Sequence, residues 1–200
     1  MASTASPYGF RAVNELGGLP YAGSTRSFLI NPAGYNANIY NGNVVALVGG
    51  YLQNVTTVGS SAGNVFPAGT IGIFVGCSYV NAQGQTIFSQ YYPANATNAV
   101  AFVIDDDRAV FQVQADGPIT QAELGQNVIL AEGQTNSTGS TTSGNSTIAV
   151  SATAAATSTY AFRIVGFAQG PDQAVGDAKT DILVKFNVGV HSYSNANGIA

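Results

Sequence analysis

The sequence predicts an all-β protein, an antiparallel barrel or sandwich with one short helix and an extended N-terminal arm. Runs of β-branched and aromatic residues alternate with Gly, Asn, Asp and Pro, which is the pattern of strands joined by turns. Hydrophobic residues make up 46% of the 200 residues, including 10 Tyr and 10 Phe, so the chain can bury a core instead of staying disordered. Only one segment carries the start signal of a helix.

Residues 1–27 have no sustained hydrophobic period, and we expect them to form an extended arm before a single β-rich domain over residues 28–200. The arm contains two aromatic rings and a cation in one short motif, made of Pro7, Tyr8, Gly9, Phe10 and Arg11. Rings on an extended segment contribute little until a groove holds them. We therefore hypothesise that this motif binds a partner, while an arm folded back on its own domain is an equally open alternative.

Strands are expected along the whole domain, at residues 28–30, 38–40, 44–48, 70–79, 86–92, 99–104, 109–114, 128–130, 159–167 and 182–190. Asn41–Gly42 is a hairpin signal. The segment 70–92 predicts a hairpin, and its glycines are expected where backbones come close or a strand bends. The strands at 99–104 and 109–114 predict a second pair around the acidic turn 105–108.

The remaining segments are short or polar. Thr120 and Glu123 stand at capping-box spacing and predict one turn of helix that ends at Gly125. Residues 133–147 contain no apolar residue, which predicts an exposed loop or a wide hairpin tip. Residues 169–172, Gln-Gly-Pro-Asp, predict a turn.

Charged residues form 8% of the chain, where about 25% is usual, so the surface must be covered with hydroxyls, amides, glycine and tyrosine. Such a surface repels its own kind poorly and suits a crowded assembly. A net charge of -4 with six scattered Lys and Arg argues against nucleic-acid binding. We expect no signal peptide and no membrane span, because neither pattern occurs in the sequence.

No catalytic motif stands out, and we expect no enzyme, no cofactor and no metal. A Ser-His-Asp site would have to use His191, which we interpret as a structural histidine in the last strand. Cys77 cannot form an internal disulfide, and its apolar neighbours predict a buried, inert thiol. The glutamates, Glu15, Glu123 and Glu132, lie beside no Trp, which leaves glycosidase chemistry without specific support.

Two further groups have two interpretations each. Asp105, Asp106 and Asp107 could bind Ca²⁺, but consecutive strand residues point to opposite sides, which favours a solvated turn with Arg108 offsetting part of the charge. The segment 91–93, Tyr-Tyr-Pro, could stack on a sugar, although strand aromatics more often pack in a core.

Five stretches carry a resemblance that spans most of the chain: residues 2–11, 72–79, 87–94, 103–116 and 184–191. They contain PYGFR, GIFVGCSY, IFSQYYPA, VIDDD with FQVQAD, and VKFNVGVH. Together they resemble the capsid decoration (cement) proteins of tailed bacteriophages. The chain departs from that pattern at Val13, where the family often has Pro, and at Tyr92, near which it often has Trp.

This resemblance implies a β-rich cement protein on the outside of a virion capsid, assembled in the host cytoplasm. It would bind the major capsid protein, bridge neighbouring capsid subunits and form a homodimer or homotrimer. The rival hypothesis is a carbohydrate- or cell-surface-binding module of a virion, such as a head-fibre tip, that uses the loop 133–147 and exposed tyrosines. A secreted β-domain exported by a nonclassical route is a third alternative.

Overall fold

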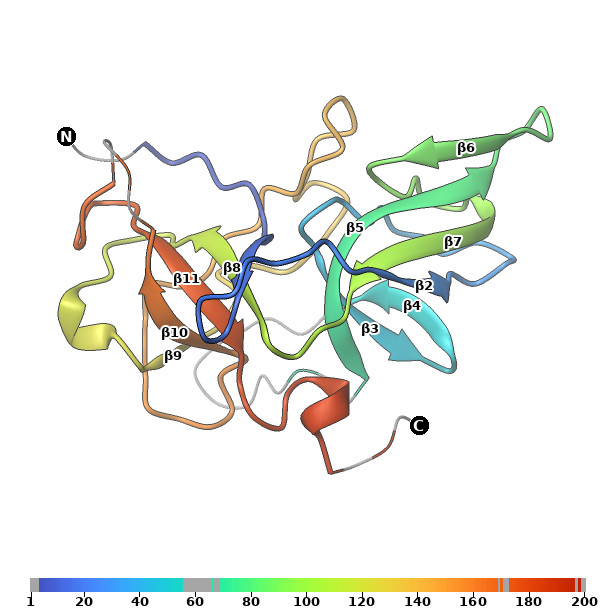
Figure 1. Cartoon of the computed structure of the whole chain (residues 1–200). Coiled ribbons are helices and arrows are strands. Elements are labelled where there is room, and N and C mark those ends of the chain that lie inside the picture. The colour runs from blue at the N-terminus through green and yellow to red at the C-terminus, as the bar shows by residue number, and fades with distance from the viewer. Residues whose placement is uncertain are drawn as a thin grey trace.

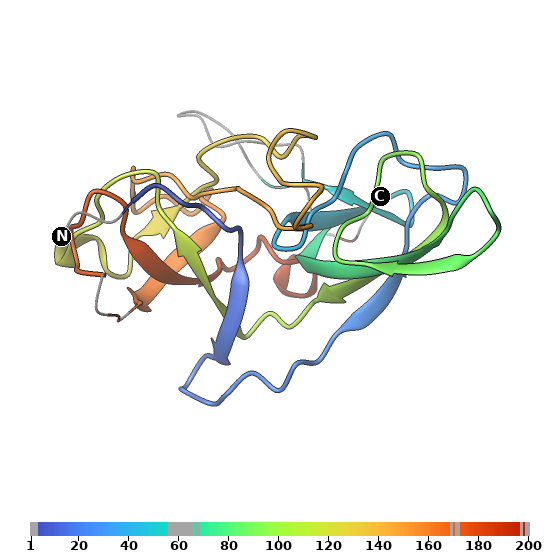
Figure 2. The ribbon, with the colours of Figure 1, turned by 90° about the horizontal axis from the view of Figure 1, so that it is seen from above.

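A computed structural model describes residues 4–55, 66, 69–168, 170, 173–196 and 198. The protein is all-β, as predicted, and consists of two antiparallel sheets that pack together. The sheets lie toward opposite ends of an elongated molecule (Figures 1 and 2). The described strands do not close into a barrel, so the structure supports the sandwich alternative.

Sheet A, on the left in Figure 1, contains five strands in the order β1 (Arg11–Glu15), β8 (Ala109–Gln114), β11 (Asp181–Phe186), β10 (Phe162–Phe167) and β9 (Asn127–Val128). Alternate residues of its central strands point inward, as the period of a strand requires. Phe111 and Val113 of β8, with Ile182 and Val184 of β11, are fully buried.

Sheet B, on the right in Figure 1, has the order β2 (Arg26–Leu29), β7 (Thr97–Ile104), β5 (Thr70–Val80), β3 (Val44–Val48) and β4 (Tyr51–Asn54), while β6 (Thr86–Ser89) pairs with the second half of β5. Gly72 of β5 confirms the predicted close approach of backbones. A Cβ at this position would lie 1.9 Å from the carbonyl oxygen of Ile104 on β7, so only glycine fits.

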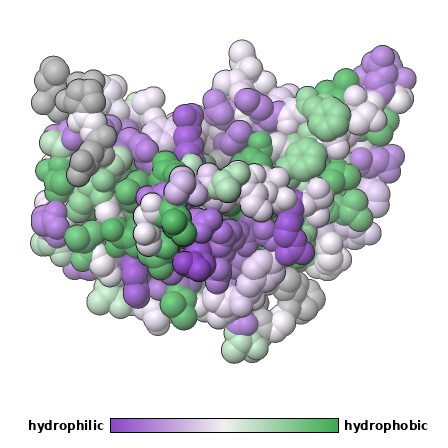
Figure 3. Space-filling model, viewed as in Figure 1, coloured by the Kyte–Doolittle hydropathy of each residue, from purple (hydrophilic) through white to green (hydrophobic). Residues whose placement is uncertain are grey.

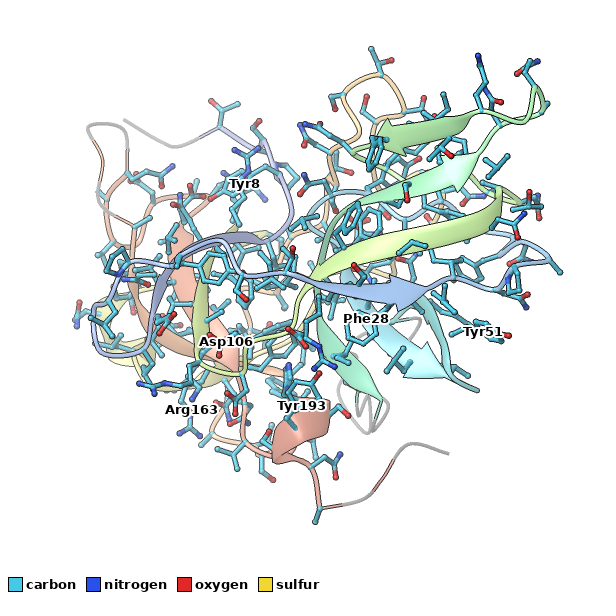
Figure 4. The ribbon with its side chains drawn as sticks, turned by 45° about the vertical axis from the view of Figure 1, so that its right-hand side comes forward. Tyr8, Phe28, Tyr51, Asp106, Arg163 and Tyr193 are labelled. Carbon is cyan, nitrogen blue, oxygen red and sulfur yellow. The ribbon has the colours of Figure 1, made fainter. Side chains whose placement is uncertain are left out.

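Two hydrophobic clusters hold the sheets. The first lies between sheet A and sheet B and contains the rings of Phe10, Phe111, Phe162 and Phe186. The second lies on the other face of sheet B, which points away from sheet A. It includes Leu52, Phe74, Tyr92 and Ala101. Phe28 of β2 packs against the second cluster on the side that faces β3 and β4 (Figure 4).

Two hairpin predictions were wrong. β7 and β8 are not a pair, because β7 belongs to sheet B and β8 to sheet A, and residues 105–108 connect the sheets. After Asn41–Gly42 the strand β3 pairs with β4 and β5, whereas Ile39 bridges Tyr92. A turn composition indicates where the chain reverses, but it does not say which sheet accepts the next strand.

Other local predictions were confirmed. β5 and β6 form the hairpin expected over residues 70–92. The predicted helical turn is the 3₁₀ helix η1 (Gln121–Glu123), where the Glu123 carboxylate accepts hydrogen bonds from the backbone N–H and the hydroxyl of Thr120. A second 3₁₀ helix, η2 (Ser192–Ser194), follows β11. No helix in the described part of the chain is long and apolar enough to cross a bilayer.

The N-terminal segment is folded back on its own domain, which is the second of the two alternatives. Its residues Arg11–Glu15 form β1 and pair with β8, so ordered β-structure begins well before residue 28. The connection from β1 to β2 is mostly exposed. The residues of β1 are all partly buried or exposed, so this strand has no alternation of apolar and polar residues from which it could be predicted.

The polar segment 133–147 is only partly exposed. Gln134, Thr138 and Ser146 are buried, and Asn145 forms a β-bridge with Asn41. The segment therefore packs onto the domain through polar groups, which its lack of apolar residues could not predict. Of the turn predicted at 169–172, all but Gly170 lies outside the described residues.

Candidate docking surface

The five residues of the N-terminal motif do not form one exposed patch. Phe10 is 1% exposed, and its ring centroid lies 4.6 Å from that of Phe162 and 6.4 Å from that of Phe111. Its backbone N–H donates to the carbonyl oxygen of Gly42 at 3.0 Å. Phe10 therefore contributes its surface to the core of its own chain, and this differs from its predicted role in binding a partner.

Pro7 and Tyr8 are half-buried, Arg11 is exposed, and Gly9 is buried. The Tyr8 hydroxyl donates to Oδ2 of Asp181 at 2.9 Å, and burial together with the Asp181 charge raises the pKa of Tyr8. Arg11 is exposed, and its guanidinium lies 4.9 Å from the Tyr8 ring centroid. Gly9 has a φ of +74°, a conformation that favours glycine. Capsid binding by Pro7, Tyr8, Gly9 and Arg11 stays a prediction.

His191 has the surroundings of a structural histidine, but its predicted place in the last strand was wrong, because β11 ends at Phe186 and His191 caps η2. It is fully buried, and its ring meets Phe186 and Tyr193 edge-on at centroid distances of 5.3 and 5.0 Å. Its Nδ1 accepts from the Tyr193 backbone N–H at 3.2 Å. Burial lowers the pKa of His191, which favours the neutral ring. A neutral histidine enclosed in this way is poorly placed to exchange a proton with a substrate.

Asp105 takes part in a cluster that joins three segments. Its Oδ2 accepts from Nη1 of Arg26 at 2.9 Å and from the hydroxyl of Tyr193 at 2.7 Å. Burial and this hydrogen bond raise the pKa of Tyr193 to about 12. The cluster ties the start of β2 and the middle of η2 to the connection between the sheets (Figure 4). Its contacts fix the C-terminal segment in place.

The acidic turn itself differs from the prediction in one respect. The cation that offsets Asp105 is Arg26, whereas the backbone N–H of Arg108 donates to Oδ1 of Asp106 at 2.8 Å. A search of the residues that the structure describes finds no group of three or more His, Cys, Asp or Glu with the geometry of a metal site.

Tyr92 and Cys77 are core residues, and Tyr91 is half-buried beside them. Tyr92 is fully buried, its hydroxyl donates to the Ala96 carbonyl oxygen at 2.8 Å, and Tyr91 stacks on Tyr40 at a centroid distance of 5.8 Å. The packing interpretation of these aromatics is confirmed. Cys77 is 1% exposed, and burial raises the pKa of its thiol to about 12, as expected for an inert cysteine.

Two carboxylates meet at one surface hollow. The hollow lies beside the N-terminal segment and is lined by Pro7, Asp116, Glu132 and Lys179, among others. Oδ1 of Asp116 accepts the backbone N–H of Ala152 at 2.7 Å, and Nζ of Lys179 donates to the backbone oxygen of Asp116. Asp116 and Lys179 therefore both take part in holding the fold at the edge of this hollow.

The charges of the chain are segregated along the sequence. Between Arg26 and Asp105 the sequence contains no Asp, Glu, Lys, Arg or His. This stretch supplies all of sheet B after the first residue of β2, whereas the other charged residues belong to sheet A, its connections and the termini. One half of the molecule is therefore an uncharged lobe. The overall charged fraction of 8% does not reveal this division, whereas the positions of the charged residues along the sequence do.

One face of the uncharged lobe carries an exposed cross-strand row of residues. Leu29 lies opposite Val100, Val100 opposite Ser78, and Ser78 opposite Phe88, so the row crosses β2, β7, β5 and β6 on a single face. We call this row the outer ladder. Its two ends are the most exposed, with Leu29 at 58% and Phe88 at 76%.

The face that carries the outer ladder is the one on which sheet A packs. Farther along it, Ile73 lies opposite both Val44 and Ile104, and all three are buried in the cluster shared with sheet A. Sheet A thus covers one end of this face and leaves the ladder end bare. Figure 3 shows apolar residues gathered over β5, β6 and β7 in the right-hand lobe.

No protein-family model matches this sequence, and searches of curated proteins and of solved structures also give no match. The fold and the surface together present an uncharged lobe with a partly bare apolar sheet face. Such a face can bury apolar area against a partner without desolvating any charge.

Proposed function

We propose that this chain is a non-enzymatic structural protein, a capsid decoration protein of a tailed bacteriophage that binds the outer surface of the head and bridges major capsid protein subunits. One observation carries the proposal: half of the fold is an uncharged lobe whose sheet leaves Leu29 and Phe88 exposed at the two ends of the outer ladder. The resemblance of the sequence to that family supplies the kind of assembly.

The physical case for docking starts from the cost of exposing Phe88. Covering a phenylalanine side chain contributes about 1.5–3 kcal/mol, and Leu29 would add a similar amount. Larger contiguous apolar patches on a protein surface mark binding sites. The edge strand β6 also lacks the charges and prolines that usually protect a free edge.

The mechanism is passive. Surface is buried between the decoration protein and the shell, and no bond is made or broken. A unit that contacts two or more capsid subunits at once gains avidity, because the second contact is intramolecular. The shell is stabilised because its subunits can then separate only after those contacts break.

The test uses phage heads that lack this protein. Heads are mixed with the purified chain and imaged, and the proposal expects extra density at fixed lattice positions together with a higher temperature of head rupture. Bovine serum albumin serves as the control for nonspecific adsorption. Heads that bind no chain, or that bind it without lattice order, would refute the assignment.

A carbohydrate-binding role has its own supporting observation. The loops of the uncharged lobe are rich in amides, such as Asn81, Gln83 and Gln85 at the exposed tip between β5 and β6. Amides recognise neutral sugars through hydrogen bonds without the cost of desolvating a charge. Saturable binding on a glycan array, lost when this tip is replaced by Gly-Ser, would favour this second candidate.

A further inference from the structure

We propose that the outer face of sheet A binds an extended acidic segment of a partner protein, and that Arg163 and Lys185 hold its carboxylates. This face lies on the other half of the molecule from the outer ladder, so it is a contact beyond the one that the proposed function uses. A chain that bridges two subunits needs two contact surfaces, and the outer face of sheet A would supply the second.

Two of the six cations of the chain lie directly opposite one another. Arg163 of β10 pairs with Lys185 of β11, so both side chains project from the same face of the sheet. Their sequence neighbours Phe162 and Val184 are buried in the core, which means that the two cations point outward. Arg163 is exposed and Lys185 is half-buried. Figure 4 shows Arg163 at the surface on the sheet A side of the molecule.

This arrangement is unfavourable in the free chain. Like charges directly opposite on neighbouring strands destabilise a sheet. In the part of the chain that the structure describes, the only ion pair joins Arg26 and Asp105, so neither Arg163 nor Lys185 has an acidic partner there. A carboxylate supplied by another molecule would turn this repulsion into two attractive contacts.

The acidic residue on the same strand does not neutralise the pair. Asp181 begins β11, about 13 Å along the strand from Lys185. It is 6% exposed, and its Oδ2 accepts from the Tyr8 hydroxyl at 2.9 Å and from Nε2 of Gln112 at 3.2 Å. Exposed charges more than about 8 Å apart are largely screened at physiological salt. The face around Lys185 is therefore locally cationic, although the chain carries a net charge of -4.

A buried amide orients the guanidinium of Arg163. Nε of Arg163 donates to Oδ1 of Asn127 at 3.1 Å. Asn127 is 2% exposed, and its Nδ2 donates to the Thr157 carbonyl oxygen at 2.8 Å, which fixes the amide in place. No described residue accepts a hydrogen bond from the two Nη groups of Arg163. This end of the guanidinium matches a carboxylate, which it can bind through two parallel hydrogen bonds.

The surface beside the pair favours a protein segment over a small anion. Leu183 lies two residues before Lys185 on the same face, opposite Gly166. It lines a surface hollow together with Val13 and Phe167, among others, and the described lining contains no charged residue. A phosphate ion would leave this hollow empty, whereas a segment with an apolar residue beside its carboxylates would fill it. Nucleic acid would need a longer row of cations than one pair.

The experiment titrates the isotopically labelled full chain with the peptide acetyl-Glu-Val-Glu-Glu-Val-Glu-amide and follows the backbone amides by NMR. The amide signals of Arg163, Gly166, Leu183 and Lys185 are expected to shift and to reach saturation. Binding should weaken several-fold between about 20 and 200 mM salt, because the contact is ionic and exposed. The same peptide with Gln in place of every Glu is the control, and it should leave these signals unchanged.

A charge reversal tests the pair itself. Lys185→Glu places a carboxylate opposite Arg163, so it should weaken peptide binding by about tenfold or more. The same change should raise the thermal midpoint of the free chain by about 1–3 °C, because a repulsive cross-strand pair becomes attractive. Arg108→Glu is the matched control, since Arg108 is exposed in the connection between the sheets and the change in net charge is the same. It should keep peptide binding within about twofold of wild type.

Each outcome decides the assignment. Peptide binding that persists in Lys185→Glu and in the milder Lys185→Gln, or shifts confined to sheet B, would overturn this inference. A lower thermal midpoint in both variants would show that Lys185 stabilises the free chain and would contradict the unfavourable pair. Saturation of the same amides by inorganic phosphate, without any response to the acidic peptide, would assign the pair to small oxyanions and also overturn the inference.

These results are distinguishable from a failure of the proposed function. Peptide binding at Arg163 and Lys185, by a chain that never adds to phage heads, would support this site and refute the decoration role. Ordered addition to heads by a chain that does not bind the peptide would overturn the acidic-segment site and leave the decoration role in place.

Discussion

The side chain of Gln134 pairs with the backbone of Val44 as a neighbouring strand would. Its Oε1 accepts from the Val44 N–H at 2.6 Å, and its Nε2 donates to the Val44 carbonyl oxygen at 2.8 Å and to that of Val55 at 2.9 Å. All of these groups are buried. One amide side chain therefore satisfies three backbone groups in the middle of the fold.

Replacing this amide should be costly. Gln134→Leu removes the partner of the buried Val44 N–H and of the buried Val55 carbonyl oxygen, while the Val44 carbonyl oxygen keeps the Val55 N–H at 3.1 Å. We expect a loss of about 2–5 kcal/mol in the free energy of unfolding. Urea denaturation followed by circular dichroism measures the change. Gln83→Leu, on the exposed hairpin tip, is the control and should change stability by less than about 0.5 kcal/mol. A small effect at both positions would mean that water replaces the amide.

Gly72 and Gly84 are glycines for different reasons. At Gly72 a side chain would collide with a neighbouring backbone, and at Gly84 the backbone has a positive φ. Gly72→Ala should prevent soluble folding, because its Cβ would lie 1.9 Å from the Ile104 carbonyl oxygen. Gly84 has a φ of +77° with nothing within 4 Å of an added Cβ, so Gly84→Ala should cost only about 1–2 kcal/mol. The yield of soluble protein and the thermal midpoint report both effects. Equal behaviour of the two variants would contradict this explanation.

Much of the local structure was predictable because it depends on nearby residues. The β5–β6 hairpin follows from alternating strand residues around the Asn81–Gly84 turn, and η1 follows from the spacing of Thr120 and Glu123. The division of strands between two sheets was not predictable. It depends on long-range contacts, such as that of Arg26 with Asp105, which no local pattern records.

The docking surface was missed for a different reason. The total charged fraction does not show where the charges lie, and the motif at residues 7–11 left two alternatives open, binding to a partner and folding back on the domain. Phe10 is part of the core because its ring packs against Phe111 of β8 and Phe162 of β10, and only the assembled sheet A brings these two rings together. Phe88, in an ordinary strand pattern, is exposed because β6 pairs only part of β5 and sheet A does not reach it.

Phe10 and Phe88 form a matched pair for testing this exchange of roles. Phe10→Ala should lower the free energy of unfolding by about 3–5 kcal/mol, because it leaves a cavity between buried rings. Phe88→Ala should lower it by less than about 0.5 kcal/mol, because the Phe88 side chain is 76% exposed. Chemical denaturation at low protein concentration compares them. A loss of less than about 1 kcal/mol for Phe10→Ala would mean that the N-terminal segment does not pack in the core.

Cys77 offers a direct probe of the face of sheet B that points away from sheet A. Its thiol is buried, and burial raises its pKa to about 12, so almost no reactive thiolate is present near neutral pH. We expect negligible reaction with Ellman's reagent in the native state and one thiol per chain after unfolding in urea. Rapid reaction of the native protein would show that this face opens readily. Cys77→Ser in urea provides the blank.

The pH dependence of stability should report on His191. Burial lowers its pKa in the folded state below the ordinary value of 6.5, so the unfolded chain takes up a proton more readily as the pH falls. Stability is therefore complete above about pH 6.5 and declines as the pH drops toward the lowered pKa, with a slope of at most about 1.4 kcal/mol per pH unit. Urea titrations between about pH 5 and 7 measure this slope, in a range above the ordinary pKa of the carboxylates. His191→Phe removes the titrating group and should flatten the profile, even if losing the acceptor for the Tyr193 N–H lowers stability at every pH. A slope that survives in His191→Phe would assign the pH dependence to other groups, and stability that rises as the pH falls would mean that the folded protein holds the charged ring.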